Sequence, residues 1–470
     1  MPLILGANSV SGYSIKNSLR FNSGSSDYLN RTPSSATNRN TWTWSAWVKR
    51  SILSSYQVLF EAKQDANNDT GIWFLNDNTL KFFNNVAGVT HYITTSQVFR
   101  DVSAWYHIVA VWDTTNATAS DRIKLYVNGT QITNFSASSN ASLNENSTIN
   151  NTQVHTIGRV DTVYYYDGYV SEINFIDGQA LTPSSFGETD TLSGIWIPKA
   201  YTGTYGTNGF YLKFANSASL GTDSSGNGNN FTVNNLTSVD QSTDTPTNNF
   251  CTLNPLVQAG SVTSGATYTY SNGNITITAS GNKWVAPYGS IGLTMGKWYY
   301  EMKLTTFASP TGSPVRVGWG ALDDVVKDNE VYFRGLTYDL GNGNLVAGSG
   351  GTGSNVLTGQ TTFTQGNIVG VAIDLTNNTI SYYKNGTITS ISNYDYSGVN
   401  TDIKSSLGYN NAPQIVFYGD NSASNILDLN FGSPPYSANG YADANGYGNF
   451  SYAVPSGYYA LCTKNLANYG

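Results

Sequence analysis

Charged residues and cysteines are scarce in this sequence. Only 11% of the 470 residues are charged, and 23 Lys and Arg residues stand against 30 Asp and Glu residues, for a net charge of −7. The basic residues form no cluster, so we expect neither nucleic acid nor an anionic membrane surface as a partner. The two cysteines, Cys251 and Cys462, are too few for a disulfide framework, and we expect both to be reduced thiols.

Long apolar runs and helical periodicity are also missing. No stretch is long enough to cross a bilayer, so we expect no membrane insertion. Residues 1–10 have neither the basic start nor the apolar core of a signal peptide, which favours synthesis in a cytoplasm without signal-directed export. No segment has the spacing of an amphipathic helix over a useful length, so helices are not expected to build the fold.

Aromatic residues and turn formers are abundant instead. The chain is 13% aromatic, with 33 tyrosines, and contains 47 glycines, a mixture that favours strands joined by many turns. Trp42, Trp44 and Ala46 alternate with polar residues and fall on one face of a strand. Further runs of this kind occupy residues 57–62, 71–75, 80–84, 106–112 and 122–127, and an Asn-Gly pair typical of a hairpin turn follows at 128–129.

A second series of expected strands lies in the other half of the chain. It occupies residues 275–278, 298–304, 315–319, 368–374 and 379–383, and is followed by another Asn-Gly pair at 385–386. A chain of 470 residues exceeds what one hydrophobic core usually supports. We therefore predict an all-β protein of two antiparallel β-sandwich (jelly-roll) domains in series. The expected boundaries are 1–205 for the first sandwich, 206–255 for a linker with connecting strands, 256–436 for the second sandwich and 437–470 for a C-terminal tail that docks back or contacts a neighbour.

The first half resembles the concanavalin A-like, laminin G-like jelly rolls. The motifs that carry the resemblance are Leu19-Arg20-Phe21 and the segments 43–49, 105–109, 123–129, 157–158, 166–173 and 181–183. These residues are expected to fill the space between two packed sheets, so they support the fold far more than any ligand.

The second half resembles a SPRY domain. The matching segments are 296–301, 315–319, 368–375, 379–386 and 430–432. The resemblance implies a β-sandwich that binds protein partners through loops at one edge, with no catalytic role.

The arrangement of the whole chain resembles large structural proteins of marine tailed phages, through segments 176–183, 245–250 and 454–463. This resemblance implies a component of the virion, as a tail fibre, a tail-associated adhesin or a capsid decoration. It also implies other virion proteins as partners, a homo-oligomer and contact with host-surface polysaccharide. A purely architectural role without glycan binding stays open.

Two segments are candidates for glycan or partner binding. Tyr164, Tyr165 and Tyr166 precede Asp167, and aromatic faces beside a planar polar group suit sugar recognition. Three consecutive tyrosines cannot share one face of a strand, so at least one is expected to reach solvent or a partner. A tyrosine-rich strand packed in an oligomer or against the next domain is an equal alternative. In the second half, Tyr332, Phe333 and Arg334 combine residue types that are enriched at binding hot spots.

A calcium site is a weaker possibility, and no other cofactor is expected. Several laminin G-like domains hold calcium at a loop rim, and Asp223, Asn227 and Asn229 offer oxygen ligands in a turn. An ordinary turn rich in Asn and Gly is the favoured interpretation, because few acidic residues lie there. Asp113 and Asp121 are a further, weaker pair.

Catalysis is not expected. Glycoside hydrolases of this fold need a pair of carboxylates, and the nearest candidates are Glu188 and Asp190. Ser193 stands where the usual third acidic residue would be, so an enzyme that degrades polysaccharide is the least favoured function. Of the three histidines, His107 lies inside a core motif and is expected to pack in a strand.

Overall fold

The chain consists of two compact units, residues 1–248 and 249–470. A computed structural model describes residues 12–260, 267–280, 284–307, 315–321, 334–349, 353–399, 401, 403, 411–418 and 424–470. Nearly all regular structure in these ranges is β-strand, and the α-helix among them is α1 (Thr463–Tyr469). The predicted all-β class with two antiparallel sandwiches is therefore confirmed. None of the helices in the described ranges is long and apolar enough to span a membrane.

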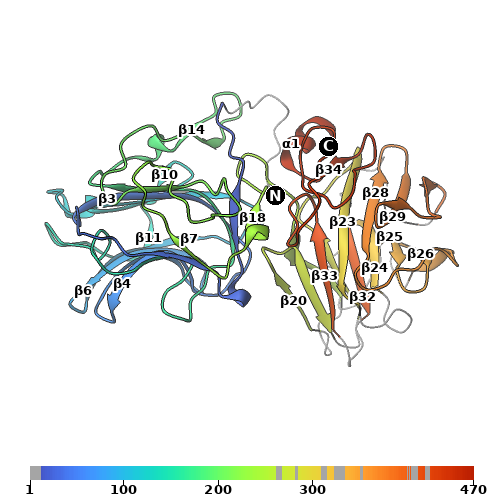
Figure 1. Cartoon of the computed structure of the whole chain (residues 1–470), viewed down its shortest axis with the longest axis horizontal. Helices are drawn as coiled ribbons and strands as arrows, with labels where there is room; N and C mark the ends of the chain where they lie inside the picture. The colour runs from blue at the N-terminus through green and yellow to red at the C-terminus, as the bar shows by residue number, and fades with distance from the viewer. Residues whose placement is uncertain are drawn as a thin grey trace. The chain divides into compact units, whose positions relative to one another are not determined.

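The first unit is a sandwich of two eight-stranded sheets. One sheet has the order β10-β9-β8-β3-β13-β1-β18, with β16 also paired to β13, and the other has the order β11-β7-β6-β5-β4-β12-β2-β17. Figure 1 shows β3 and β10 in one layer and β4, β6, β7 and β11 in the other. We call them sheet A and sheet B. A hairpin, β14-β15, forms a separate two-stranded sheet.

The strands of sheet A are β1 (Ser18–Phe21), β3 (Thr41–Arg50), β8 (Tyr106–Asp113), β9 (Ile123–Val127), β10 (Thr130–Gln131), β13 (Gly168–Asp177), β16 (Phe210–Leu212) and β18 (Gln241–Ser242). Those of sheet B are β2 (Tyr28–Arg31), β4 (Gln57–Asp65), β5 (Asn68–Phe74), β6 (Thr79–Val86), β7 (Val89–Val98), β11 (Phe135–Ser139), β12 (His155–Ile157) and β17 (Thr232–Asn234). The hairpin strands are β14 (Gly187–Thr189) and β15 (Trp196–Pro198).

Aromatic side chains from both sheets fill the space between them. Trp42 and Trp44 of β3 are fully buried, as their alternation predicted. The ring of Trp42 lies 5.5 Å from that of Phe82, and the ring of Trp44 lies 6.3 Å from that of Phe60, so β3 packs directly on sheet B. Burial of large aromatic surface in such contacts stabilises the sandwich.

The predicted hairpin turns also form. Asn128 and Gly129 have φ values of 48° and 80° and join β9 to β10, and Asn385 and Gly386 have φ values of 48° and 78°. Positive φ at both central residues is the requirement of a type I′ turn, which explains why Asn and Gly occupy them.

The expected linker belongs largely to the first unit, which corrects the boundary at residue 205. Up to residue 248 the segment supplies β16, β17 and β18, which pair with β13, β2 and β1. Its few large apolar residues, Phe210, Leu212 and Phe231 among them, are buried in the core of the sandwich. A buried ion pair of 2.8 Å between Lys49 and Asp244 fixes its end to β3.

The second unit is a sandwich of a seven-stranded and a nine-stranded sheet. The first has the order β19-β22-β32-β24-β25-β26-β27, and the second has the order β20-β21-β33-β23-β28-β29-β30, with β31 and β34 attached at its strands β29 and β23. Trp298 and Trp319 are fully buried between them, as expected.

The strands of the seven-stranded sheet are β19 (Leu253–Gly260), β22 (Trp284–Gly289), β24 (Val315–Ala321), β25 (Arg334–Asp339), β26 (Asn344–Ser349), β27 (Ser354–Leu357) and β32 (Asn411–Tyr418). Those of the nine-stranded sheet are β20 (Thr267–Ser271), β21 (Thr276–Ser280), β23 (Lys297–Thr306), β28 (Ile368–Asp374), β29 (Thr379–Lys384), β30 (Thr387–Ile388), β31 (Tyr394–Asp395), β33 (Asn425–Asn430) and β34 (Tyr459–Ala460).

The C-terminal segment docks on this second unit. β34 pairs in parallel with β23, and the buried Glu301 of β23 accepts hydrogen bonds from the backbone N–H groups of Ser451 and Tyr452, at 2.8 and 2.9 Å. Cys462 and Cys251 are both buried, and neither takes part in a disulfide, as expected.

Candidate functional site

The outer face of sheet B carries an unusual number of aromatic side chains. We call this surface the aromatic face and define it by Tyr28, Tyr56, Trp73, Phe83, Tyr92 and Tyr164. It arises from the alternation of the strands: Ile72 and Phe74 point into the core, so Trp73 between them points outward. The solvent side of an antiparallel sheet is usually polar, so this cluster of aromatic rings indicates a binding site for a ligand or a partner.

Four of the rings, those of Tyr56, Tyr164, Trp73 and Phe83, form a continuous surface whose planes are tilted against one another. The centroid of Tyr164 lies 5.2 Å from that of Tyr56 and 5.6 Å from that of Trp73, and Trp73 lies 5.5 Å from Phe83. The planes meet at angles of 53°, 55° and 82°. Tyr164 is 38% exposed, and Trp73 is partly exposed. Because the planes are tilted, a flexible ligand chain with several apolar patches would fit this surface better than a ligand with a single planar ring.

Cations lie against two ends of the aromatic face. The ammonium of Lys81 is 5.0 Å from the ring centroid of Phe83 and 4.9 Å from that of Tyr92. The guanidinium of Arg159 lies 3.5 Å from the ring centroid of Tyr28. These cation–π contacts hold the rings in place and leave polar groups at the rim.

A buried carboxyl group holds the central indole. Trp73 Nε1 donates a hydrogen bond to Glu61 Oε2, and Glu61 is fully buried. Gly71 makes this possible, because a Cβ there would lie 2.5 Å from Trp73 Nε1 and 2.8 Å from Glu61 Oε2. Burial raises the pKa of Glu61 well above its usual value, and the nearby carboxylate of Asp69 raises this pKa further.

Further charged groups border this centre. Lys63 forms an ion pair with Asp161, which comes from the loop between β12 and β13. Asp69 lies opposite Lys63 in the β4–β5 register and opposite Asn85 in the β5–β6 register. Burial also raises the pKa of Asp69.

The predicted Tyr164–Asp167 site is only partly on the surface. Tyr164 lies on the aromatic face, and Tyr165 is half-buried. Tyr166 and Asp167 are buried, so their prediction as binding residues is wrong. The Tyr166 hydroxyl donates to the Lys49 carbonyl at 2.9 Å, and Asp167 accepts from the Ser51 hydroxyl at 2.5 Å and from the Ser23 N–H at 3.0 Å. Both polar groups find their partners inside the sandwich.

The second predicted segment lies at the edge of what the structure describes. Tyr332 and Phe333 are outside the described residues. Arg334 is the first residue of β25, and its backbone pairs with Ser349 of β26.

The predicted calcium loop binds its own polar groups. Asp223 accepts from the N–H groups of Tyr211, Ser225 and Asn229, at distances of 2.9, 2.9 and 2.8 Å. The side-chain amides of Asn227 and Asn229 both donate to the Gly209 carbonyl. Among the described residues no group of three His, Cys, Asp or Glu side chains could hold a metal ion. Calcium at this loop stays a prediction.

Glu188 and Asp190 lie on the β14-β15 hairpin, away from the aromatic face. Asp190 accepts from the Ser193 N–H at 2.8 Å and so closes the turn. The same hairpin buries His107: Trp196 Nε1 donates to His107 Nδ1 at 2.9 Å, so Nε2 carries the proton and faces Ser45 Oγ at 2.9 Å. Burial lowers the pKa of His107 to about 3, which keeps the ring neutral.

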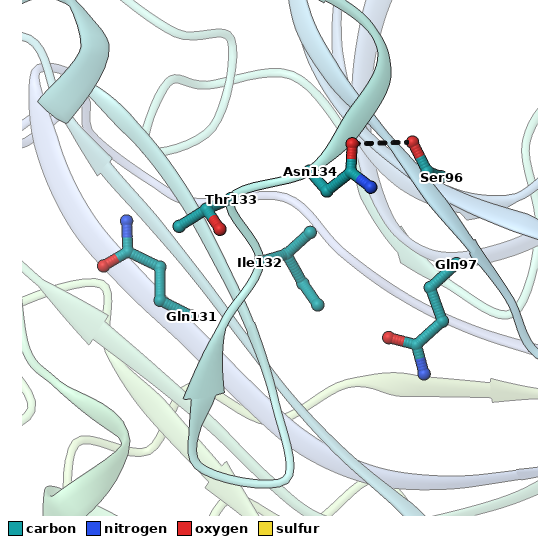
Figure 2. A pocket seen from close by; sticks show the side chains of 6 residues that line it. All are labelled: Ser96, Gln97, Gln131, Ile132, Thr133 and Asn134. Atoms are coloured by element: carbon teal, nitrogen blue, oxygen red, sulfur yellow. Dashed lines mark hydrogen bonds between the residues drawn. The ribbon is translucent and has the colours of Figure 1, made fainter.

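An open hollow of about 420 Å³ lies elsewhere on the first unit (Figure 2). It is lined by Ser96, Gln97, Gln131, Ile132, Thr133 and Asn134, and Ser96 Oγ donates to Asn134 Oδ1 at 3.3 Å. This lining contains no aromatic ring and no charged group, so it offers neither stacking nor acid–base chemistry.

Most residues of the aromatic face escaped the sequence analysis. The expected strands at 71–75 and 80–84 contain Trp73 and Phe83, and the one at 57–62 contains Glu61. Strand alternation predicts that Trp73 and Ile72 point to different faces of the sheet. It does not predict which of these faces is the core.

Comparison with known families identifies both units. Residues 23–185 match the model of the concanavalin A-like lectin/glucanases superfamily, and residues 297–405 match that of the SPRY domain. The chain joins a concanavalin A-like domain to a SPRY domain. The strands β2, β4 to β7 and β12, which carry the aromatic face or border it, all fall within the matched part of the concanavalin A-like domain.

Three solved structures illustrate what the chain is similar to. The SPRY domain of human HERC1 is 20% identical, with 38% of this chain and 96% of that one covered and a TM-score of 0.28. A heptameric SAP-like pentraxin from Limulus polyphemus is 16% identical, with 40% and 94% covered and a TM-score of 0.27. Domains LG4-5 of the mouse laminin alpha1 chain are 10% identical, with 91% and 92% covered and a TM-score of 0.29. No curated protein matches the chain.

Proposed function

We propose that this protein is a structural and adhesion component of a phage virion, whose concanavalin A-like domain binds host-surface glycan through the aromatic face. The observation that carries the proposal is the row of rings at Tyr56, Tyr164, Trp73 and Phe83, with neighbouring centroids 5.2 to 5.6 Å apart. Aromatic rings stack on the C–H surfaces of pyranoses, and nearby polar groups orient the hydroxyls.

The matched superfamily contains lectins, which supports carbohydrate binding as the class of function. The phage role rests on the resemblance of the whole chain to structural proteins of tailed phages. In this role the protein is a tail fibre, a tail-associated adhesin or a capsid decoration, and it assembles as a homo-oligomer with other virion proteins. Several copies on one particle would multiply a modest affinity per site.

The role is proposed to be non-enzymatic and independent of a metal. Glu61, the carboxyl group nearest the rings, is fully buried and engaged with Trp73, which suits a supporting role better than attack on a substrate. An architectural role without glycan binding is the second candidate. The exposed Tyr164 and the partly exposed Tyr56 and Trp73 favour it, since Tyr and Trp are also enriched at protein interfaces.

Binding of the full chain to a panel of host polysaccharides and glycans tests the proposal. We expect Tyr164→Ala and Trp73→Ala to abolish binding, while Tyr441→Ala, which removes a 47% exposed tyrosine of the other unit, leaves it unchanged. Circular dichroism would confirm that the variants fold. Binding that survives both substitutions on the aromatic face, or no binding to any glycan, would refute the proposal.

Three further measurements separate the alternatives. Release of reducing ends from any polymer in the panel would reveal an enzyme. Labelling of intact particles with an antibody against this chain would separate a tail fibre from a capsid decoration, and binding in the presence of EDTA tests independence from calcium.

A further inference from the structure

Three oxygen atoms on the aromatic face have no hydrogen-bond partner. They are Glu61 Oε1 of β4, Asp69 Oδ1 of β5 and Asn85 Oδ1 of β6, and each atom is buried. Native proteins satisfy the large majority of buried polar atoms, so three orphans on neighbouring strands point to a partner from outside the chain.

The strand register brings these three groups together. Asp69 and Asn85 are directly opposite each other, and Glu61 is opposite Gly71, which lies two residues along the same face from Asp69. Side chains in such diagonal positions remain within reach of one another. The Asp69 carboxylate acts electrostatically on Glu61, which agrees with this placement.

We propose that the aromatic face selects neutral, hydroxyl-rich sugar chains, whose hydroxyls bond to Glu61, Asp69 and Asn85, and that it discriminates against sulfated and carboxylated sugars. This inference rests on the proposed glycan-binding function and names the ligand class. A sugar hydroxyl can donate a hydrogen bond to an orphan oxygen. A sulfate or carboxylate group can only accept, and it is repelled by the acidic side chains at this place.

The nearby cations do not reverse this preference. Lys63 is paired with Asp161, and the ammonium of Lys81 is turned onto the rings of Phe83 and Tyr92. Arg159 lies over Tyr28 of β2, a strand that β12 separates from β4, and its buried Nε is an unsatisfied donor there. The cations nearest Glu61, Asp69 and Asn85 are therefore paired or turned onto rings, and at these three residues the unsatisfied atoms are acceptors.

Access to the buried oxygens requires a side chain to move, and the geometry assigns this movement to Trp73. Its indole is partly exposed and donates a hydrogen bond to Glu61, so it covers this carboxyl group and must turn away before a sugar can reach it. Sugar binding would then change the surroundings of the indole, which Trp fluorescence can detect.

The test compares one polymer with and without anionic groups. The probe is the neutral polymer that the full chain binds best among laminarin, mannan, dextran and xylan, together with the chemically sulfated form of that same polymer. We expect sulfation to weaken binding about tenfold or more, the loss expected when a charge-assisted hydrogen bond is not formed. The neutral polymer should change the Trp fluorescence of the wild type and not that of Trp73→Phe.

Two variants at Asp69 sharpen the test. Asp69→Ala removes an acceptor and should weaken binding of the neutral polymer about tenfold. Asp69→Asn keeps an acceptor but removes the charge, so it should narrow the difference between the neutral and sulfated forms. Asp65→Ala is the matched control, because Asp65 is an exposed acid at the end of the neighbouring strand β4, and its oxygens already accept from Asn67 and Asn68.

The outcomes separate this inference from the proposed function. If the sulfated polymer binds as tightly as the neutral one, or if Asp69→Ala behaves like Asp65→Ala, the selectivity is wrong although binding through Trp73 stands. Tight binding of the sulfated form that is lost in Lys81→Met would likewise overturn it in favour of an anionic glycan. If no polymer binds, or if binding survives both Trp73→Ala and Tyr164→Ala, the proposed function itself fails.

Discussion

Acidification should weaken the first unit through His107. The ring lies under the β14-β15 hairpin, stacked 4.8 Å from Trp47 and 6.0 Å from Trp196, with its Nδ1 accepting from the Trp196 indole. A protonated ring would turn a second N–H toward that indole N–H. Burial therefore lowers the pKa of His107 from 6.5 to about 3.

The sign and size of the effect follow from linkage. Between pH 6.5 and about 3 the unfolded chain binds the proton and the folded chain does not, so stability falls as the pH falls through this range. At about 1.4 kcal/mol for each pH unit, the full range corresponds to about 5 kcal/mol. His155, also buried, has its pKa lowered to about 4 and acts in the same direction. Buried Asp27, whose pKa is raised to about 6, acts in the opposite direction.

His107→Gln isolates the contribution of one ring from these other groups. The free energy of unfolding, from urea titrations at pH 4 to 7, should fall with acid more steeply in the wild type than in the variant, by up to about 1.4 kcal/mol per pH unit. NMR provides a direct check, because the chain has only three histidines. Parallel pH profiles for the wild type and the variant would refute the reasoning. So would an NMR signal of the His107 ring, identified by its absence from the spectrum of His107→Gln, that titrates near pH 6.5 in the wild type.

Three other predictions concern single contacts. Asp244→Ala leaves the Lys49 ammonium buried without its carboxylate, so the free energy of unfolding of the first unit should fall by about 3–5 kcal/mol in urea titrations. Asp244→Asn should also lower the free energy of unfolding, because it removes the charge that pairs with the Lys49 ammonium. Gly71→Ala should displace the Trp73 indole, because its Cβ would lie 2.5 Å from Nε1, and should reduce glycan binding while the far-ultraviolet circular dichroism stays unchanged. Tyr166→Phe should cost about 1 kcal/mol through the lost hydrogen bond to the Lys49 carbonyl and leave glycan binding intact, which contradicts the earlier expectation for this residue.

Sequence patterns were sufficient for the class of fold, because its determinants are local. The alternation of Trp42 and Trp44 with polar residues marks a strand whatever it packs against, and positive φ at Asn128-Gly129 follows from the residues themselves. The motif segments in both halves were sufficient to recognise a concanavalin A-like and a SPRY domain, since core positions of these sandwiches repeat in order.

The extent of the first unit and the position of its site depend on contacts between distant residues. The polar segment after residue 205 was expected to link two domains, yet its sparse apolar residues complete a core and Asp244 pairs with Lys49. Likewise Trp42 and Trp73 sit in similar alternating runs, but only the pairing and packing of the sheets bury the first and leave the second partly exposed. Strand alternation defines two faces of a strand but does not indicate which of them is buried in the core. The sequence by itself therefore determined the strands and turns, and the tertiary structure alone decided which rings reach solvent.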